Sequence, residues 1–286
     1  MLGKEDILIR KQRWDELYEV IRKFFSDRGF VEFQTPLLVQ TPGMEPNLDP
    51  FEVHLNLVHP VEQKTGGLIT SPEYSLKKLI GVGFSKIFSI TPVFRNGEAL
   101  GPHNTPEFMM LEWYAPGNYE DMMQETEELL NQYLGTSDSW PRILHENAGY
   151  DEFGDPHVVK EHFFITNFPA KEASLARLAP GGETAERFEA YANGLELCNG
   201  YAELTDPVEQ RKRFEQEQFE RKSLGKTVFP IDEEFLEGLG RIKGPIYGNS
   251  IGLDRLIMLK YRVGDINDIQ LFPANDRWRN HYGITK

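Results

Sequence analysis

Cysteine is almost absent from this sequence. Cys198 is the only one in 286 residues, so no intramolecular disulfide and no metal site built from several cysteines can form. Long apolar runs are missing too: no stretch could cross a bilayer as a helix, and the first ten residues lack the continuous apolar segment of a signal peptide. These absences argue against a membrane association and predict a location in a reducing cytoplasm.

Positive charge is scarce, with 31 Lys and Arg against 45 Asp and Glu, which gives a formal net charge of -14. Nucleic-acid-binding domains usually carry a basic face, and this bulk charge would repel a phosphate backbone. We therefore expect no long nucleic acid as a partner, or one that docks only locally. The sequence also lacks a glycine-rich phosphate loop of the P-loop or dinucleotide type, so ATP would have to bind to another architecture.

The residues that are present suit one globular domain spanning 1–286, since 40% are hydrophobic and 27% are charged. Apolar periodicity, caps and turn residues predict the elements. We expect helices at 10–28, 72–80, 118–134 and 206–224 and another starting at Asp254, and strands at 30–33, 84–94, 108–114, 162–168, 188–204 (a pair turning at Asn193-Gly194) and 247–253. Because most strands are joined as hairpins, an α+β fold with an antiparallel sheet flanked by helices is predicted.

Several polar residues interrupt these apolar segments. Arg95 ends a strand, where it could form a salt bridge or bind a phosphate or carboxylate. Glu196 and Glu203 lie an odd number of residues apart, so they face one cleft only if a bulge at Asn199-Gly200 reverses the alternation. Such carboxylates suit Mg²⁺ or an ammonium group, although solvated positions at a sheet edge explain them equally well.

Several stretches, taken together, resemble the three signatures of class II aminoacyl-tRNA synthetases and the motifs of their lysyl-type members, and they span nearly the whole chain. The lysyl-type members of the family and their paralogues that modify elongation factor P are the most similar. The stretches that carry this resemblance are the first helix with Gly29 and Pro36, Ser71-Pro72-Glu73, Arg95 to Tyr114, Glu196 to Leu204, and Gly252-Leu253-Asp254-Arg255.

The resemblance implies a two-step reaction that uses ATP and Mg²⁺. A carboxylate is first activated as an adenylate, and the ε-amine of a protein lysine then takes the acyl group. In this scheme the catalytic residues are Arg95, which holds the α-phosphate, and Arg255, which holds the γ-phosphate. Glu196 with Glu203 places Mg²⁺, while Glu98 and Asn104 contact the adenosine and Leu197 and Gly252 complete the ATP site.

The same resemblance implies (R)-β-lysine or lysine as the activated substrate and elongation factor P as the acceptor. The ammonium groups of the activated amino acid require acidic partners. Glu73, in the Ser71-Pro72-Glu73 run, would bind the amino group near the carboxylate. Glu203 with Tyr114 would bind the distal ammonium. Asn199 would orient the carboxylate, and Tyr201 would pack against the side chain of the substrate. A homodimer is implied by the first signature.

The sequence departs from the family at a few positions. Gly97 replaces the Glu of an Arg-Asn-Glu pattern, and one extra residue before Pro106 leaves open whether Asn104 or Thr105 takes the family asparagine role. Ser250 stands where lysyl-tRNA synthetases carry glycine, which could favour a β-amino acid. The segment between Tyr114 and Phe163 is shorter than is usual in the family.

Only nine residues precede the first expected helix, so we expect no anticodon-binding domain and no charging of tRNA. Two other functions stay open at this point. One is a stand-alone enzyme that activates lysine for a different acceptor. The other is an inactive synthetase paralogue that acts as a binding module, against which the joint retention of the two arginines and two glutamates argues.

Overall fold

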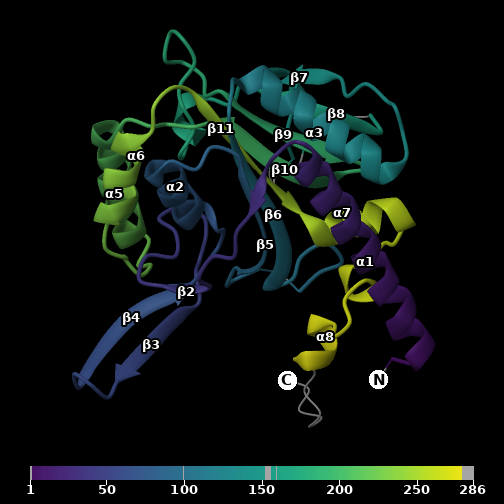
Figure 1. Ribbon diagram of the computed structural model, residues 1–286, viewed down its shortest axis with the longest axis horizontal. Helices are drawn as coiled ribbons and strands as arrows, with labels where there is room; N and C mark the ends of the chain where they lie inside the picture. Colours follow the sequence, from purple (N-terminus) through teal and green to yellow (C-terminus); the bar gives the residue numbers. More distant parts are fainter. Residues whose placement is uncertain (1, 99, 152–155, 159, 279–286) are drawn as a thin grey trace.

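The computed structural model describes residues 2–98, 100–151, 156–158 and 160–278, and its centre is an eight-stranded sheet (Figure 1). All neighbouring strands in it pair antiparallel except β1 with β5 and β7 with β8. In spatial order the strands are β1 (Val31–Glu32), β5 (Ile87–Phe94), β6 (Glu107–Pro116), β11 (Ile246–Gly252), β10 (Leu195–Ala202), β9 (Arg187–Ala192), β8 (His162–Thr166) and β7 (Arg142–Leu144). This arrangement confirms the predicted α+β class.

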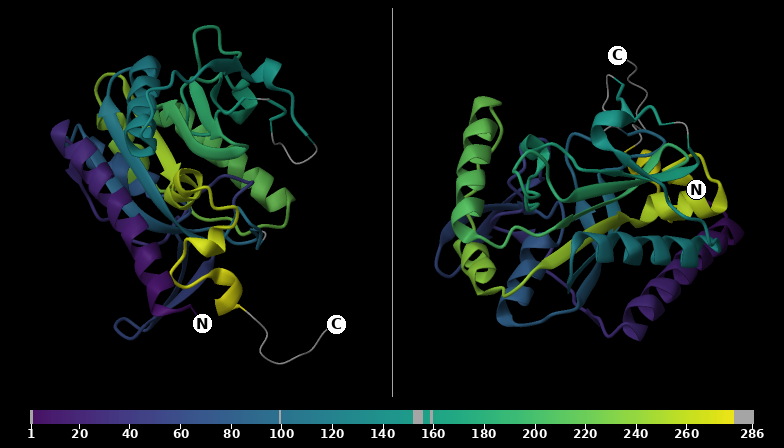
Figure 2. Two further views of the ribbon diagram at one scale, coloured as in Figure 1. Left: turned by 90° about the vertical axis from the view of Figure 1, so that its right-hand side faces the viewer. Right: turned by 90° about the horizontal axis from the view of Figure 1, so that it is seen from above.

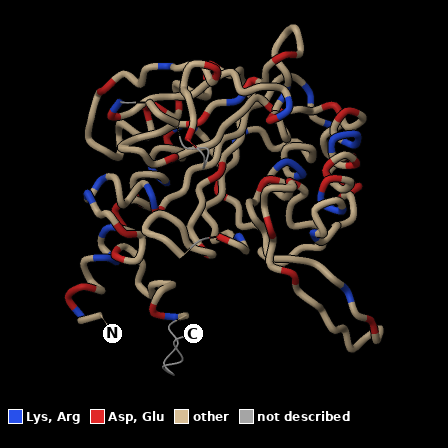
Figure 3. The backbone as a smooth tube through the Cα atoms, turned by 180° about the vertical axis from the view of Figure 1, so that it is seen from behind, with Lys and Arg blue, Asp and Glu red and all other residues tan. Residues whose placement is uncertain are grey.

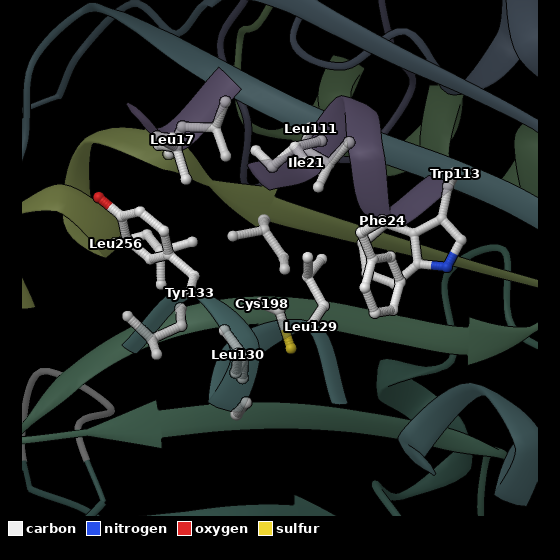
Figure 4. Close-up of a cluster of buried hydrophobic side chains, with 14 of the residues drawn as sticks. Leu17, Ile21, Phe24, Leu111, Trp113, Leu129, Leu130, Tyr133, Cys198 and Leu256 are labelled. Atoms are coloured by element: carbon white, nitrogen blue, oxygen red, sulfur yellow. The ribbon is translucent and has the colours of Figure 1, made fainter. Parts of the chain in front are cut away.

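Three helices cover one face of the sheet and enclose the main hydrophobic core: α1 (Lys4–Asp27), α3 (Tyr119–Leu134) and α7 (Leu253–Tyr261). Figure 4 shows Leu17 and Phe24 of α1, Leu129 of α3 and Leu256 of α7 in one cluster with the strand residue Trp113, which lies beside Phe24. Because side chains alternate along a strand, β6 presents Leu111 and Trp113 to this core and the residues between them to the other face.

The opposite face carries α2 (Glu73–Val82), with α5 (Pro207–Ser223) and α6 (Glu233–Arg241) beyond it (Figure 1). Helix α5 bears closely spaced charges of both signs (Figure 3). A separate three-stranded sheet of β2 (Leu38–Val39), β4 (Glu62–Leu68) and β3 (Glu52–Leu57) projects from the body of the molecule (Figure 2). The short helices are α4 (His145–Ala148) and α8 (Ala274–Arg277), with 3₁₀ turns at Ala170–Glu172 and Ile266–Asp268. None of the helices in the described part of the chain combines the length and apolarity needed to cross a bilayer.

Local signals account for several of these boundaries. Asn118 caps α3 and exchanges hydrogen bonds with Asp121, as its spacing predicted. The turn at Asn193-Gly194 has positive φ at both positions, 49° and 78°, which is the conformation that favours these two residues in a tight hairpin. Gly29, at φ 77°, follows the end of α1 and lets the chain turn into β1.

Other boundaries differ from the sequence prediction. Helix α1 begins six residues earlier than expected, at Lys4, and α2 has Pro72 rather than Ser71 at its N-cap, although the Ser71 hydroxyl accepts a 3.4 Å hydrogen bond from the Glu73 amide. Asp206 caps α5, but Glu209 pairs with Arg213 instead of completing a capping box. Helix α6 and the β3–β4 hairpin were not predicted, because short amphipathic segments between glycines and prolines give weak periodicity.

Candidate active site

A cavity of about 920 Å³ opens on the sheet face that α2 covers, and a second of about 150 Å³ adjoins it. The two share their boundary residues, among them Arg95, Glu196, Asn199 and Ser250. Strands β6, β9, β10 and β11 form the floor. The site therefore lies at the centre of the antiparallel sheet, where neighbouring strands hold each side chain at a fixed register.

All seven predicted ATP-binding residues line the smaller cavity: Arg95, Glu98, Asn104, Glu196, Leu197, Gly252 and Arg255. Leu197 contributes backbone there, because its side chain lies in the main core. Open space faces Gly252, where a Cβ would meet no atom within 4 Å. This cavity thus brings together residues from the loop after β5, from β10, from the end of β11 and from α7 that are far apart in sequence.

Arg95 lies where the two cavities meet, with its guanidinium 5.2 Å from the centroid of the Phe108 ring. Its Nε is fully buried without a hydrogen-bond partner, and no carboxylate of the described residues forms an ion pair with it. Burial lowers the pKa of Arg95, although the negative charges of Glu196 and Glu98 oppose that shift. A buried guanidinium in this state is costly, so the site favours an anionic ligand at this position.

Arg255, on α7, is held by backbone and amide oxygens. Its Nη1 donates to the Glu196 carbonyl at 2.8 Å, and its Nη2 donates to Oδ1 of Asn104, also at 2.8 Å. Asn104 therefore meets Arg255 at the cavity, whereas Thr105 is buried and its hydroxyl has no partner. This contact favours Asn104 for the role that the sequence left open between the two residues.

An acidic pocket, made of Glu73, Lys77, Glu112 and Glu203, lies at the closed end of the larger cavity. Nζ of Lys77 donates to Oε1 of Glu73 at 2.5 Å and forms an ion pair with Glu203. The Tyr201 hydroxyl donates to the same Glu73 oxygen at 2.7 Å, and Tyr114 donates to Glu112 at 2.6 Å. The side chains of Lys77 and Glu203 are both fully buried.

The carboxylates of this pocket outnumber its cation, and their ionisation reflects that imbalance. Burial raises the pKa of Glu203 to about 8; Lys77 opposes the rise and Glu73 adds to it. Burial and the charge of Glu73 hold the pKa of Glu112 well above its usual range. A cationic ligand stabilises the ionised form of buried carboxyl groups whose pKa is raised, so the pocket suits ammonium groups.

Of the predicted substrate-binding residues, Ser71, Glu73, Tyr114, Asn199 and Tyr201 line the larger cavity. Pro72 is buried at the start of α2, and Glu203 lies behind the cavity wall beside Gly248, where a Cβ would approach Oε1 of Glu203 to 2.4 Å. Glycine at position 248 thus keeps Glu203 within reach of the cavity, which Gly248 itself lines.

The prediction that Glu196 and Glu203 share one metal ion is wrong. A bulge does reverse the alternation of β10, but it lies between Glu196 and Cys198 rather than at Asn199-Gly200. Seven residues still separate the two glutamates, which is about 23 Å along an extended strand. Lys77, moreover, already neutralises Glu203.

Glu189 on β9 is the carboxylate that Glu196 meets instead. Both line the larger cavity, and burial together with the charge of Glu196 raises the pKa of Glu189 to about 7. Arg187 and Tyr191 orient Glu189 by hydrogen bonds of 2.6 and 2.7 Å. No group of three or more His, Cys, Asp or Glu suited to a metal occurs among the residues that the structure describes.

Sequence reasoning missed Lys77, Phe108, Glu112 and Glu189 as functional residues. Lys77 follows Glu73 by four residues on a predicted helix, a spacing that places the two side chains together. Glu112 stands between the core residues Leu111 and Trp113, so alternation assigns it to the other face. These signals were available, whereas the proximity of the Glu189 and Glu196 charges depends on the hairpin register.

An unpaired guanidinium in a nucleotide-sized cavity, next to an acidic pocket on an antiparallel sheet, defines an activating domain of the class II synthetase type. The sequence model of class II tRNA synthetases (D, K and N) matches residues 9–276, and the chain belongs to this family.

Several curated relatives within the family carry the name elongation factor P–(R)-β-lysine ligase. The one from Avibacterium paragallinarum is 36% identical over 300 aligned residues, which cover 90% of this chain and 92% of the relative. The relative from Edwardsiella ictaluri is 34% identical, with an alignment that covers 91% of this chain and 93% of the relative. The relative from Salmonella paratyphi B is 34% identical, with an alignment that covers 89% of this chain and 92% of the relative. The chain is similar to these proteins over nearly their full length.

Proposed function

We propose that this protein is an ATP-dependent, AMP-forming ligase that activates (R)-β-lysine and transfers it to the ε-amine of a lysine on elongation factor P. The names of its relatives indicate this substrate and acceptor. The acidic pocket supports a substrate with two ammonium groups, because its three buried carboxyl groups outnumber the one ammonium group of Lys77. The adjoining cavity, lined by Arg95 and Arg255, supports a nucleotide with several phosphates.

The observation that carries the proposal is the state of Arg95. Its Nε is buried without a partner at the junction of the two cavities, where a substrate carboxylate would meet the α-phosphate of ATP. Charge develops at that point in the first step. An oriented guanidinium with no internal partner can stabilise this charge without first breaking an ion pair.

In the first step, a carboxylate oxygen of the amino acid attacks the α-phosphorus of ATP. The new P–O bond gives an aminoacyl-adenylate, and the bond to the β-phosphate breaks to release pyrophosphate. Arg95 faces the reacting phosphate and Arg255 the far end of the triphosphate. Asn199, whose Oδ1 accepts a 3.1 Å hydrogen bond from Arg187, lies at the boundary and orients the amino-acid carboxylate.

In the second step, the neutral ε-amine of the acceptor lysine attacks the carbonyl carbon of the adenylate. An amide bond forms, the bond to the phosphate oxygen breaks, AMP leaves, and the amine nitrogen gives up a proton. The larger cavity extends past Glu45 to the α5 residues Glu217 and Glu220. This outer part gives the acceptor side chain a route to the carbonyl carbon.

The site also fits Mg²⁺, which is commonly held by one or two carboxylates together with substrate phosphates. Glu189 and Glu196 would hold it, since both line the larger cavity, and the raised pKa of Glu189 beside the charge of Glu196 supports this assignment. When bound, the ion would neutralise charge on the phosphates. Glu203 does not contribute to this metal site and binds an ammonium group of the substrate instead.

Two further features belong to the same proposal. Ser250 lies at the boundary of both cavities, where its hydroxyl donates to the Asn199 carbonyl at 3.3 Å, and it would favour the β-isomer over lysine. A single catalytic domain working as a homodimer in the cytoplasm, without a tRNA substrate, completes the account. The net charge of -14 supports the last point.

Pyrophosphate exchange tests the proposal. The purified protein is incubated with ATP, labelled pyrophosphate and either (R)-β-lysine or L-lysine. We expect label to enter ATP with both, at a higher kcat/KM for (R)-β-lysine. Exchange with neither diamino acid, from a protein that melts cooperatively, would refute the proposal, while a preference for L-lysine would instead identify a stand-alone lysine-activating enzyme.

A further inference from the structure

Lys77 is the one cation of the acidic pocket, and its surroundings make it unusual. Its side chain is completely buried, and it bridges two carboxylates from distant parts of the chain: Glu73 on α2 and Glu203 just after β10. The rings of Tyr114, Tyr201 and Phe235 surround its Nζ at 5.5–5.9 Å. A lysine rarely occupies such a position unless ion pairs hold it there.

Lys77 engages only one oxygen of each partner. It contacts Oε1 of Glu73 and Oε2 of Glu203, and Tyr201 shares the Glu73 oxygen. Oε2 of Glu73 and Oε1 of Glu203 receive no contact from it. The latter oxygen lies against Gly248, which lines the larger cavity, and Glu73 lines the same cavity directly. The bridge therefore leaves one oxygen of each carboxylate for a ligand.

Charge balance gives this arrangement a consequence. Three buried carboxylates, Glu73, Glu112 and Glu203, surround one ammonium group. Without Lys77 they would repel one another, take up protons and lose their preference for cations. With Lys77 in place, Glu73 and Glu203 are held at defined positions, and the carboxyl groups still outnumber the one ammonium group. A ligand with a single ammonium group leaves one of these buried carboxyl groups without a cationic partner, which is unfavourable.

We propose that Lys77 is a positioning residue that determines specificity, because it clamps Glu73 and Glu203 so that the pocket accepts amino acids with two ammonium groups and rejects those with one. This inference rests on the proposed function and deepens it by naming how the substrate class is chosen. Lys77 acts through the two glutamates and does not touch the reacting atoms. Helix α2 carries both Lys77 and Glu73, and it packs between the sheet and α6, which holds the clamp rigid (Figure 1).

The test compares two substrates that differ only in the distal ammonium group: (R)-β-lysine and (R)-3-aminohexanoic acid. Pyrophosphate exchange gives kcat/KM for each with the wild type and with Lys77→Met. We expect the ratio of the two values to fall by about tenfold or more in the variant, because the clamp that penalises a missing ammonium is gone. The KM for ATP should stay unchanged.

If Lys77 had a purely structural role, Lys77→Met would lower kcat/KM by the same factor for both substrates and leave the ratio of the two values unaltered. That result would overturn the inference. Lys77→Arg, which retains the charge, should recover part of the ratio. If Lys77→Met does not fold, the double variant Lys77→Met/Glu203→Gln removes both buried charges together, and wild-type discrimination in it would likewise overturn the inference. Absence of exchange in the wild type would defeat the proposed function instead, so the two failures are distinguishable.

Discussion

Arg255 holds Glu196 by its backbone rather than by its charge. Nη1 of Arg255 lies 2.8 Å from the Glu196 carbonyl oxygen, whereas the Glu196 carboxylate is 3.6 Å away. The guanidinium thus ties α7 to the start of β10 and forms only a long ion pair with that carboxylate, which lines both cavities. The carboxylate therefore keeps room for a cation beside a phosphate-binding arginine.

Replacement of Arg95 by lysine should lower kcat for pyrophosphate exchange by roughly 10²–10³-fold, because an ammonium cannot reproduce the planar donor set at the reacting phosphate. The KM for the amino acid should change little. Steady-state exchange kinetics measure both quantities. Arg211→Lys, in an exposed pair on α5, serves as the matched control, and equal kinetics for the two variants would contradict this role for Arg95.

Glu189→Gln should raise the Mg²⁺ concentration needed for half-maximal exchange by about 10–100-fold, since the pair with Glu196 is broken. The maximum rate at saturating Mg²⁺ should recover in part. A titration of exchange rate against Mg²⁺ measures this change. Glu186→Gln removes a carboxylate paired with Arg177 nearby and should leave the titration unaltered; an unshifted curve for Glu189→Gln would remove this residue from the metal site.

Glu203→Ala should lose activity chiefly through the amino acid, with a large rise in its KM and little change in the KM for ATP. In the wild type, the pKa of Glu203 is raised to about 8. The substrate ammonium requires the ionised form, so the amino-acid KM should fall as the pH rises from 7 to 9. Exchange measured across that range provides the check, and normal exchange by the variant at low amino-acid concentration would contradict it.

The stability of the protein should depend on Glu217, which lines the outer part of the larger cavity. Burial and the charge of Glu45 raise the pKa of Glu217 from 4.5 to about 8. Between these values the unfolded chain releases the proton while the folded protein keeps it, so stability falls as the pH rises through this window. Glu217→Gln should therefore be more stable than the wild type at pH 8, by about 1–3 kcal/mol given its partial exposure, and should match it near pH 4.5.

Thermal melting at the two pH values measures this difference. Glu215→Gln, two residues earlier on α5 and exposed, is the control and should melt like the wild type at both. A Glu217→Gln variant with no gain in Tm at pH 8 would show that this carboxylate is ionised in the folded protein.

Ser250→Gly should reduce the preference for (R)-β-lysine over L-lysine, because it removes a side chain at the boundary where the amino acid meets the phosphate. The change amounts to a few atoms, so a shift of about 10-fold in the ratio of kcat/KM values is the expected scale. Competition between the two substrates in one exchange assay measures the ratio. An unchanged ratio would place the choice of isomer elsewhere in the pocket.

Much of the fold was predictable because local and periodic signals agree with it. The apolar face of α1, the Asn118 cap and the Asn193-Gly194 turn each depend on neighbours in sequence. The β5–β6 hairpin and the strand leading to Arg255 follow for the same reason. Helix α6 was missed because its nine residues contain Gly238 and Gly240, which weaken the helical signal.

The candidate site was predictable in its residues and less so in its groupings. Arg95, Asn104 and Arg255 line the same cavity, as expected. Glu196 and Glu203, however, do not act as a pair: the charge of Glu196 acts on Glu189, and Glu203 forms an ion pair with Lys77. A bulge between Glu196 and Cys198 and the β9–β10 register decide those contacts, and sequence spacing encodes neither. Lys77 illustrates the same limit, since its bridge to Glu203 spans 126 positions even though its bond to Glu73 spans four.

The intact mass of elongation factor P measures the central claim most directly. Purified elongation factor P is incubated with the protein, ATP, Mg²⁺ and (R)-β-lysine, and its mass is compared with that from a parallel incubation with Arg95→Met. We predict a gain of one β-lysyl group in the first sample, located on a lysine side chain by peptide fragmentation, and none in the second. An unmodified factor in the presence of an enzyme that does form the adenylate would contradict the account and indicate a different acceptor.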